Sequence, residues 1–146
     1  MAQALKLVPT SGWHPMDPAE AAEAVDRMQP AAALADDPAA VLALWRYQLL
    51  TGKWGMVQLC TGRDGTPVAG LIFRIVDDTL HIVALAKWAN SDLDLITAAD
   101  DAADQLARAY GLARVCMETV RPGMVKRLQG LAWDSRNIEM VRHVRR

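Results

Sequence analysis

The chain has 146 residues, of which 52% are hydrophobic and 23% charged, and its net charge at neutral pH is −1. This composition excludes an intrinsically disordered protein, and the length suits a single domain over residues 1–146 with one hydrophobic core. A net charge near zero gives no overall attraction to nucleic acid or to an acidic membrane surface, so neither is an expected partner.

Two further features indicate the cellular setting. No apolar run approaches the roughly 20 residues that a membrane-spanning helix needs. The two cysteines, Cys60 and Cys116, lie in apolar runs typical of strands, which favours buried free thiols over a disulfide. We therefore expect a soluble, cytoplasmic protein, or one packaged into a particle that is assembled inside a cell.

The chain predicts an alternation of strands and helices. In chain order we expect a strand at 4–8, helices at 17–28 and 37–50, strands at 56–61, 67–76 and 79–87, a long helix at 91–110, a strand at 114–120, a short helix at 122–129 and a strand at 137–144. The fold class is therefore α/β (α+β). It has a single mixed, mostly antiparallel sheet with helices on both faces and the order β-α-α-β-β-β-α-β-α-β.

Local signals set the boundaries of these elements. Asp17 and Asp37 are each followed by proline, which is a typical helix start. Pro30 is expected to stop the first helix, and Ser91 is expected to cap the long one. The strand at 114–120 is too apolar to be half exposed, so we place it in the middle of the sheet.

The polar residues of the long helix and of the C-terminus are expected to face solvent. Asp100, Asp101, Asp104 and Arg108 fall on the face opposite the apolar one, with Asp104 and Arg108 spaced for a weak ion pair. The acidic residues are not spaced as metal ligands, and we expect no metal site. The arginines at 142–146 read as a solvated tail, with contact to nucleic acid as the weaker alternative.

The element order resembles that of the GNAT family of N-acetyltransferases. The segment Arg127-Leu-Gln-Gly-Leu-Ala-Trp133 is similar to the closing pattern of that family. The segment Glu118-Thr-Val-Arg-Pro-Gly123 resembles a divergent group of GNAT-like proteins from bacteriophages and prophages, although Met124 stands in the aromatic position of that group. The second resemblance implies the cytoplasm of a host cell or a virion as the location.

The family resemblance implies acetyl-CoA or another acyl-CoA as cofactor. It assigns cofactor binding to the end of the fourth expected strand and the turn after it, at Ala86, Lys87, Trp88 and Asn90. The chain departs from the family there, because residues 86–95 contain no glycine and no arginine. Asp92 and Asp94 also fall in the first expected turn of the long helix, where a carboxylate satisfies the helix dipole and repels a pyrophosphate. The tyrosine that usually serves as general acid is replaced by Leu128.

Two titratable residues on the strands beside the expected substrate site are candidates for a catalytic base, His81 and Glu118. The simpler interpretation is that His81 is solvated or satisfied in place and that Glu118 is bonded to nearby backbone or paired with Arg121.

The sequence leaves two functions open. One is an acyltransferase that acts on an amine, with the acyl-CoA between the strands at 79–87 and 114–120. The other is a catalytically inactive GNAT-like phage or prophage protein, a virion-associated or host-interaction component. The second predicts self-association or protein partners and exposed tryptophans, with Trp13 and Trp88 as candidate anchors.

Overall fold

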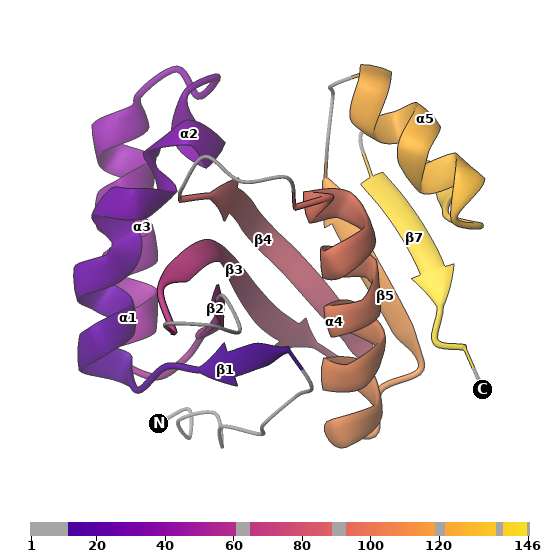
Figure 1. Ribbon diagram of the computed structural model, residues 1–146, viewed down its shortest axis with the longest axis horizontal. Coiled ribbons are helices and arrows are strands. Elements are labelled where there is room, and N and C mark those ends of the chain that lie inside the picture. Colours follow the sequence, from indigo (N-terminus) through magenta and orange to yellow (C-terminus); the bar gives the residue numbers. More distant parts are fainter. Residues whose placement is uncertain (1–11, 61–64, 89–92, 119–121, 137–138, 146) are drawn as a thin grey trace.

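The computed structural model describes residues 12–60, 65–88, 93–118, 122–136 and 139–145 (Figure 1). The strands are β1 (Trp13–Pro15), β2 (Gly55–Cys60), β3 (Pro67–Val76), β4 (Thr79–Lys87), β5 (Arg114–Glu118), β6 (Asp134–Arg136) and β7 (Glu139–His143). The helices are α1 (Pro18–Ala24), the 3-10 helix η1 (Val25–Met28), α2 (Gln29–Ala32), α3 (Pro38–Leu50), α4 (Leu95–Ala109) and α5 (Pro122–Gly130).

The strands form one seven-stranded sheet in the order β1-β2-β3-β4-β5-β7-β6. The β4–β5 pair is parallel, and the other described pairs are antiparallel. Helices α1 to α3 and η1 cover one face around a core that includes Met28, Met56 and Ile72. Helix α4 covers the other face around Leu71, Phe73 and a row of its own alanines (Figure 1). The predicted fold class is thus confirmed, and β5 lies inside the sheet as expected.

The predicted helix starts at Asp17 and Asp37 are confirmed. Each side chain accepts a hydrogen bond from the backbone N–H three residues later, at 3.0 and 3.1 Å. The prediction for Pro30 was wrong, because α2 begins at Gln29 with Pro30 in its first turn. A first-turn residue has no intrahelical acceptor for its N–H, so proline is tolerated there.

Other boundaries also differ from the predictions. The expected strand at 4–8 and most of the expected turn at 63–65 lie outside the described residues, and the described part begins its sheet with β1. Helix α4 starts at Leu95 with Asp94 as its N-cap, so Ser91 is not the cap. The expected final strand at 137–144 is part of a hairpin of β6 and β7.

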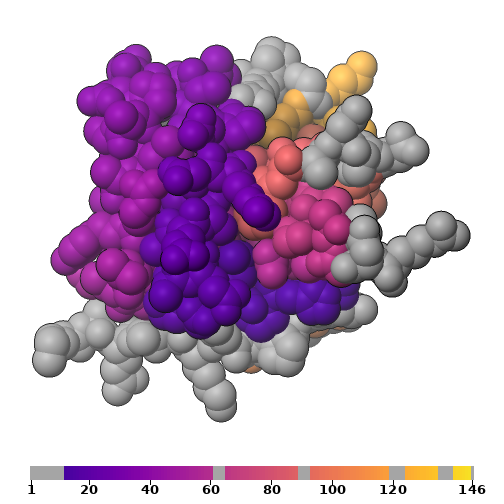
Figure 2. All heavy atoms as spheres, turned by 60° about the vertical axis from the view of Figure 1, so that its left-hand side comes forward, coloured from indigo at the N-terminus to yellow at the C-terminus, as the bar shows by residue number. Residues whose placement is uncertain are grey.

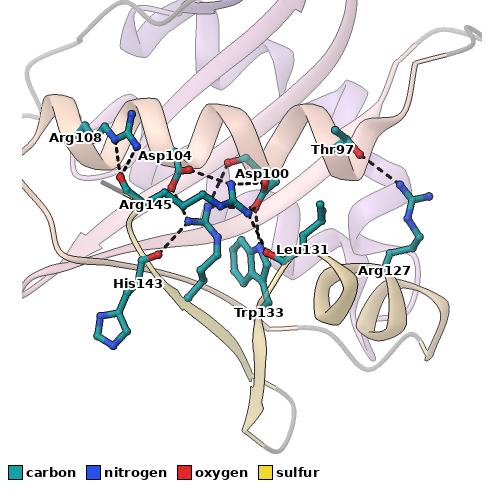
Figure 3. Close-up of polar contacts among 10 residues, drawn as sticks. Thr97, Asp100, Asp104, Arg108, Arg127, Leu131, Trp133, His143 and Arg145 are labelled. Atoms are coloured by element: carbon teal, nitrogen blue, oxygen red, sulfur yellow. Dashed lines mark hydrogen bonds and ion pairs between the residues drawn. The ribbon is translucent and has the colours of Figure 1, made fainter.

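The largest correction concerns the polar residues of α4. Asp100 and Asp104 are buried, with 3% and 7% of their surface exposed, and do not face solvent. Arg142, itself only 5% exposed, donates a hydrogen bond to the Asp104 carboxylate at 2.6 Å and forms an ion pair with that of Asp100 at 3.1 Å. Both carboxylates also accept hydrogen bonds from Arg145 (Figure 3). Arg142 and Arg145 are therefore structural cations. The expectation of a solvated tail was wrong for Arg142, whereas Arg145 keeps 41% of its side chain exposed. The hydrogen bond to Asp100 raises the pKa of Arg145, which stays charged.

Further contacts complete this cluster. The indole Nε1 of Trp133 donates to Asp100 at 2.8 Å, and its ring lies 5.3 Å from the Arg142 guanidinium. Asp104 was expected to form an ion pair with Arg108. The guanidinium of Arg108 instead donates to the backbone carbonyl of Arg145 (Figure 3). The cluster ties α4 to the C-terminal hairpin across about forty residues of sequence.

The two tryptophans expected to be exposed are also partly or fully covered. Trp13 is 2% exposed, and its Nε1 donates to the carbonyl of Ala98 in α4, so it is a core residue. Trp88 is half buried after β4 and packs its ring over Gly70 of β3.

The contact between Trp88 and Gly70 leads to a stability prediction. A Cβ at residue 70 would lie 2.2 Å from the indole ring, so Gly70→Ala must displace the ring. We expect a loss of about 1–3 kcal/mol in the free energy of unfolding, measured by urea denaturation. Gly130→Ala is the control, because a Cβ there meets nothing within 4 Å. Equal stability of both variants and the parent chain would show that Trp88 has room to move.

Candidate functional site

The buried side chains of β4 point to one face of the sheet in its first half and to the other face in its second half. Its register with β3 shifts at Val83, which has no partner in that ladder. Before this bulge Leu80 and Ile82 pack into the core beneath α4, whereas after it Ala84 and Ala86 pack beneath α1 to α3. The bulge therefore turns the second half of β4 relative to the first.

Strands β4 and β5 separate at the same level. Their parallel pairing ends at Ile82 and Met117, while β4 continues to Lys87. In Figure 1 the tip of β4 points toward α2, β5 leads toward α5, and the first turn of α4 lies near the opening. Glu118 follows the last paired residue and thus lies at the apex of the opening. In open α/β sheets ligands bind beyond the carboxyl ends of such strands.

A groove with a volume of about 410 Å³ lies beside this apex. Val115 and Met117 belong to the core under α4, so the residues that alternate with them, Cys116 and Glu118, point to the other face of the sheet. The groove is lined on that face by Arg74, His81, Cys116 and Glu118, with the β3–β4 turn and Arg114 at its rim. The structure therefore brings together the two residues predicted as catalytic, His81 and Glu118.

Arg74 fixes the protonation of His81. Its Nε and Nη2 lie 3.3 and 3.2 Å from His81 Nδ1, and a guanidinium has only donors, so Nδ1 is the acceptor and carries no proton. The ring proton is then on Nε2, which lies 4.0 Å from Glu118 Oε1. In this tautomer His81 presents a donor to Glu118 and cannot act as a base at Nε2. The carboxylate of Glu118, with 56% of its side chain exposed, is the group left to accept a proton.

Arg74 was not singled out in the sequence. Its guanidinium lies over the ring of Trp54, 5.7 Å from the centre of that ring. The signal that could have found it is an arginine inside the apolar run 67–76, placed opposite His81 by the short turn at Asp77 and Asp78. Arg121, the expected partner of Glu118, lies outside the described residues.

The rim of the groove carries a second ion pair. Arg114 Nη2 donates to Asp78 Oδ1 at 2.8 Å, and this hydrogen bond holds the pKa of Asp78 below its ordinary value and raises that of Arg114. The groove thus has balanced charges at its rim, while Asp77 adds an exposed acid beside it.

The residues expected to bind the cofactor lie in different surroundings. Ala86 is 3% exposed and its side chain belongs to the core beneath α1 to α3. Lys87 and Trp88 line a surface pocket of about 410 Å³ that also includes Arg27, whose guanidinium lies 5.3 Å from the Trp88 ring. Asn90 lies outside the described residues.

The first turn of α4 already holds an anion. Asp94 accepts hydrogen bonds from the backbone N–H and the hydroxyl of Thr97, at 3.3 and 2.9 Å, and pairs with Arg127 of α5 at 2.6 Å. The hydrogen bond from Arg127 lowers the pKa of Asp94. Arg127 also reaches Thr97 (Figure 3), and the adjacent Leu128 is buried. Two residues that the sequence marked as departures from the GNAT pattern, Asp94 and Leu128, therefore have structural roles.

Other types of site are not indicated in the described ranges. There, no three His, Cys, Asp or Glu side chains are grouped so that they could hold a metal ion. No helix among the same residues is long and apolar enough to cross a membrane.

The arrangement of the strands and of the β4–β5 opening can be compared with known proteins. No protein-family model and no curated protein sequence matches the chain. Several solved structures, in contrast, match the chain. The ribosomal-protein-S18-alanine N-acetyltransferase from Escherichia coli matches with a TM-score of 0.67 at 12% identity, covering 92% of this chain and 94% of that one. The chain has a GNAT-like fold.

Two other structures agree with this result. A GNAT-family acetyltransferase from Streptococcus pneumoniae has a TM-score of 0.60 at 12% identity over 91% of this chain and 98% of that chain. Ard1 from Thermoplasma volcanium has a TM-score of 0.60 at 13% identity, over 92% and 97%. At such low sequence identity the similarity shows a shared fold, whereas the activity depends on the residues of the site.

Proposed function

We propose that the protein transfers an acyl group from an acyl-CoA of the acetyl-CoA type to an amine. The observation that carries this proposal is the position of Glu118 at the apex of the β4–β5 opening, beside a groove and next to a histidine whose tautomer is fixed. The GNAT-like fold of the chain supports it, since the similar solved structures include acetyltransferases.

The residues of the groove have distinct roles in this proposal. An acyl thioester would supply an electrophilic carbonyl carbon, and its C–S bond would break as the C–N bond forms, releasing a thiolate that takes its proton from solvent. Glu118 accepts the proton that the amine loses as its nitrogen bonds to that carbon. His81 directs its Nε2 proton toward the Glu118 carboxylate, while Arg74 holds His81 in that tautomer.

The opening offers two kinds of contact to the cofactor, one for its pantetheine arm and one for its phosphates. Beyond Val83 the edge of β4 that faces β5 has no strand partner in the described part of the chain, so its backbone groups can pair with the amides of a pantetheine arm. For the phosphates, the candidate cations are Lys87 after the bulge, with Arg27 in the same pocket, and Arg127 on α5. The Asp94 carboxylate competes with the phosphates for Arg127 and for the Thr97 N–H, which weakens binding.

A specific observation favours a second candidate, a catalytically inactive GNAT-like protein, including a phage or prophage component that binds other proteins. The Asp94 carboxylate occupies the helix N-terminus where a diphosphate would bind, and Leu128 replaces a proton donor with a buried apolar side chain. In this candidate the residues near the opening serve stability alone.

Calorimetric titration with acetyl-CoA separates the two candidates. We expect a micromolar dissociation constant, about −8 kcal/mol, for the acyltransferase. Arg127→Met should weaken binding by roughly tenfold because it removes a charge-assisted contact. Arg46→Met is the matched control, since Arg46 of α3 is also a half-exposed arginine in a surface ion pair, here with Asp26 of η1, away from α4 and α5. No heat at millimolar acetyl-CoA would select the inactive candidate.

A further inference from the structure

Helix α3 is apolar on all sides. Its 13 residues, PAAVLALWRYQLL, contain one charged side chain, Arg46. Trp45 and Leu49 are buried against the rest of the protein, as the inner face of a surface helix should be. The outer face carries Leu44, Tyr47 and Leu50, which are 49%, 57% and 58% exposed. Leu34, 68% exposed, precedes the helix. A helix that is hydrophobic all round is normally covered on both sides.

The outer face is a continuous stripe. Ala40, Ala43, Tyr47 and Leu50 recur at intervals of three and four residues, and Leu44 adjoins them. A helix of this length extends for about 20 Å, which is enough for several turns of helix-to-helix packing. Figure 2 turns this side of the molecule forward, and the purple segment that contains α3 forms the left-hand part of the surface shown.

Charges at the two ends of α3 indicate what covers the stripe. Arg46 already pairs with Asp26 of the same chain at 2.7 Å and requires no outside partner. The N-terminal end carries the exposed acids Asp36 and Asp37. The C-terminal end carries Lys53, whose Nζ lies 5.8 Å from the centre of the Tyr47 ring and therefore on the outer face. The helix thus has an acidic end, an apolar middle and a basic end.

We propose that this face binds a second copy of the chain, with the two α3 helices antiparallel across a two-fold axis near Leu44. In that arrangement the basic end of each helix meets the acidic end of the other, so the same ion pair forms twice. A parallel arrangement would place like charges together. Charge complementarity of the face with itself, not merely its apolar character, assigns the occupant. The proposal is independent of the acyltransferase activity.

The first test is sedimentation velocity over a range of concentrations up to about 100 μM, where a dimer of this kind is expected to be populated. Tyr47→Glu should raise the dimer dissociation constant by roughly 30-fold or more, as for a central apolar contact. Val76→Glu is the matched control, because Val76 is 45% exposed at the end of β3, away from α3, and should leave the dimer unchanged. A parent chain that stays monomeric would overturn the proposal and indicate a different partner for the face.

The second test concerns the antiparallel geometry. Lys53→Glu and Asp36→Lys, each alone, place like charges together at both ends and should weaken the dimer. Mixing the two variants should restore it, because in the mixed dimer every end meets an opposite charge. Asp36 is chosen over Asp37 because the side chain of Asp37 caps α3. Failure of the mixture to associate more tightly than either variant would exclude this arrangement. A dimer whose dissociation constant is unchanged in both single variants would also exclude the antiparallel arrangement.

Discussion

Replacing Arg142 by methionine is expected to lower the free energy of unfolding by about 3–5 kcal/mol. The guanidinium is enclosed between two buried carboxylates, at 2.6 Å from Asp104 and 3.1 Å from Asp100. Methionine fills a similar volume but removes the cation. Among the described residues, the cation that remains beside both carboxylates is Arg145, which is 41% exposed, and Asp100 keeps the indole N–H of Trp133. Removing one partner of a buried ion pair costs more than the pair itself contributes, because the remaining charge is desolvated without compensation.

Urea denaturation measures this loss, and Arg46→Met is the control. Arg46 and Asp26 form an ion pair that is 43% and 72% exposed, so its loss should cost about 0–1 kcal/mol. A double-mutant cycle with Asp104→Ala then isolates the coupling between Arg142 and Asp104. Equal stability of Arg142→Met and Arg46→Met would mean that water reaches the cluster and that its charges are not desolvated.

This cluster shows where sequence reasoning fails. Helical periodicity sorts residues into apolar and polar faces, and on that basis Asp100 and Asp104 belong with the solvent. Their partners lie about forty residues away, and local spacing contains no information on a contact at that distance. The available signal was a pair of acids at i, i+4 in the helix and a pair of arginines at i, i+3 at the C-terminal end, with Arg142 in the last strand and Arg145 just after it.

The elements that were predicted correctly depend on local chemistry. Asp17 and Asp37 cap helices because their side chains accept nearby backbone N–H groups, and the meander follows from short turns between apolar runs. The candidate site was predicted in part. Glu118 and His81 were found as titratable groups on apolar strands. The contact of His81 with Arg74 could not be predicted in this way, because it depends on the register between β3 and β4.

Replacing Glu118 by glutamine is expected to reduce the rate of acyl transfer by about 10²- to 10⁴-fold, the usual contribution of a general base. Glutamine keeps the size of the side chain and its hydrogen bonding but cannot accept the proton of the amine. The release of free thiol from acetyl-CoA in the presence of primary amines measures the rate. Calorimetry should show unchanged binding of acetyl-CoA, since Glu118 contacts the groove and not the phosphates in the proposed arrangement.

Two variants complete this experiment. Glu23→Gln alters an exposed glutamate on α1, outside the groove, and should keep full activity. Arg74→Met should give a smaller loss than Glu118→Gln and change the pH profile, because it frees Nδ1 of His81 to take a proton and allows an imidazolium beside Glu118. If Glu118→Gln keeps the parent rate while Arg74→Met does not, the base is His81 and the tautomer argument is wrong. If both keep it, the catalytic base lies outside this groove.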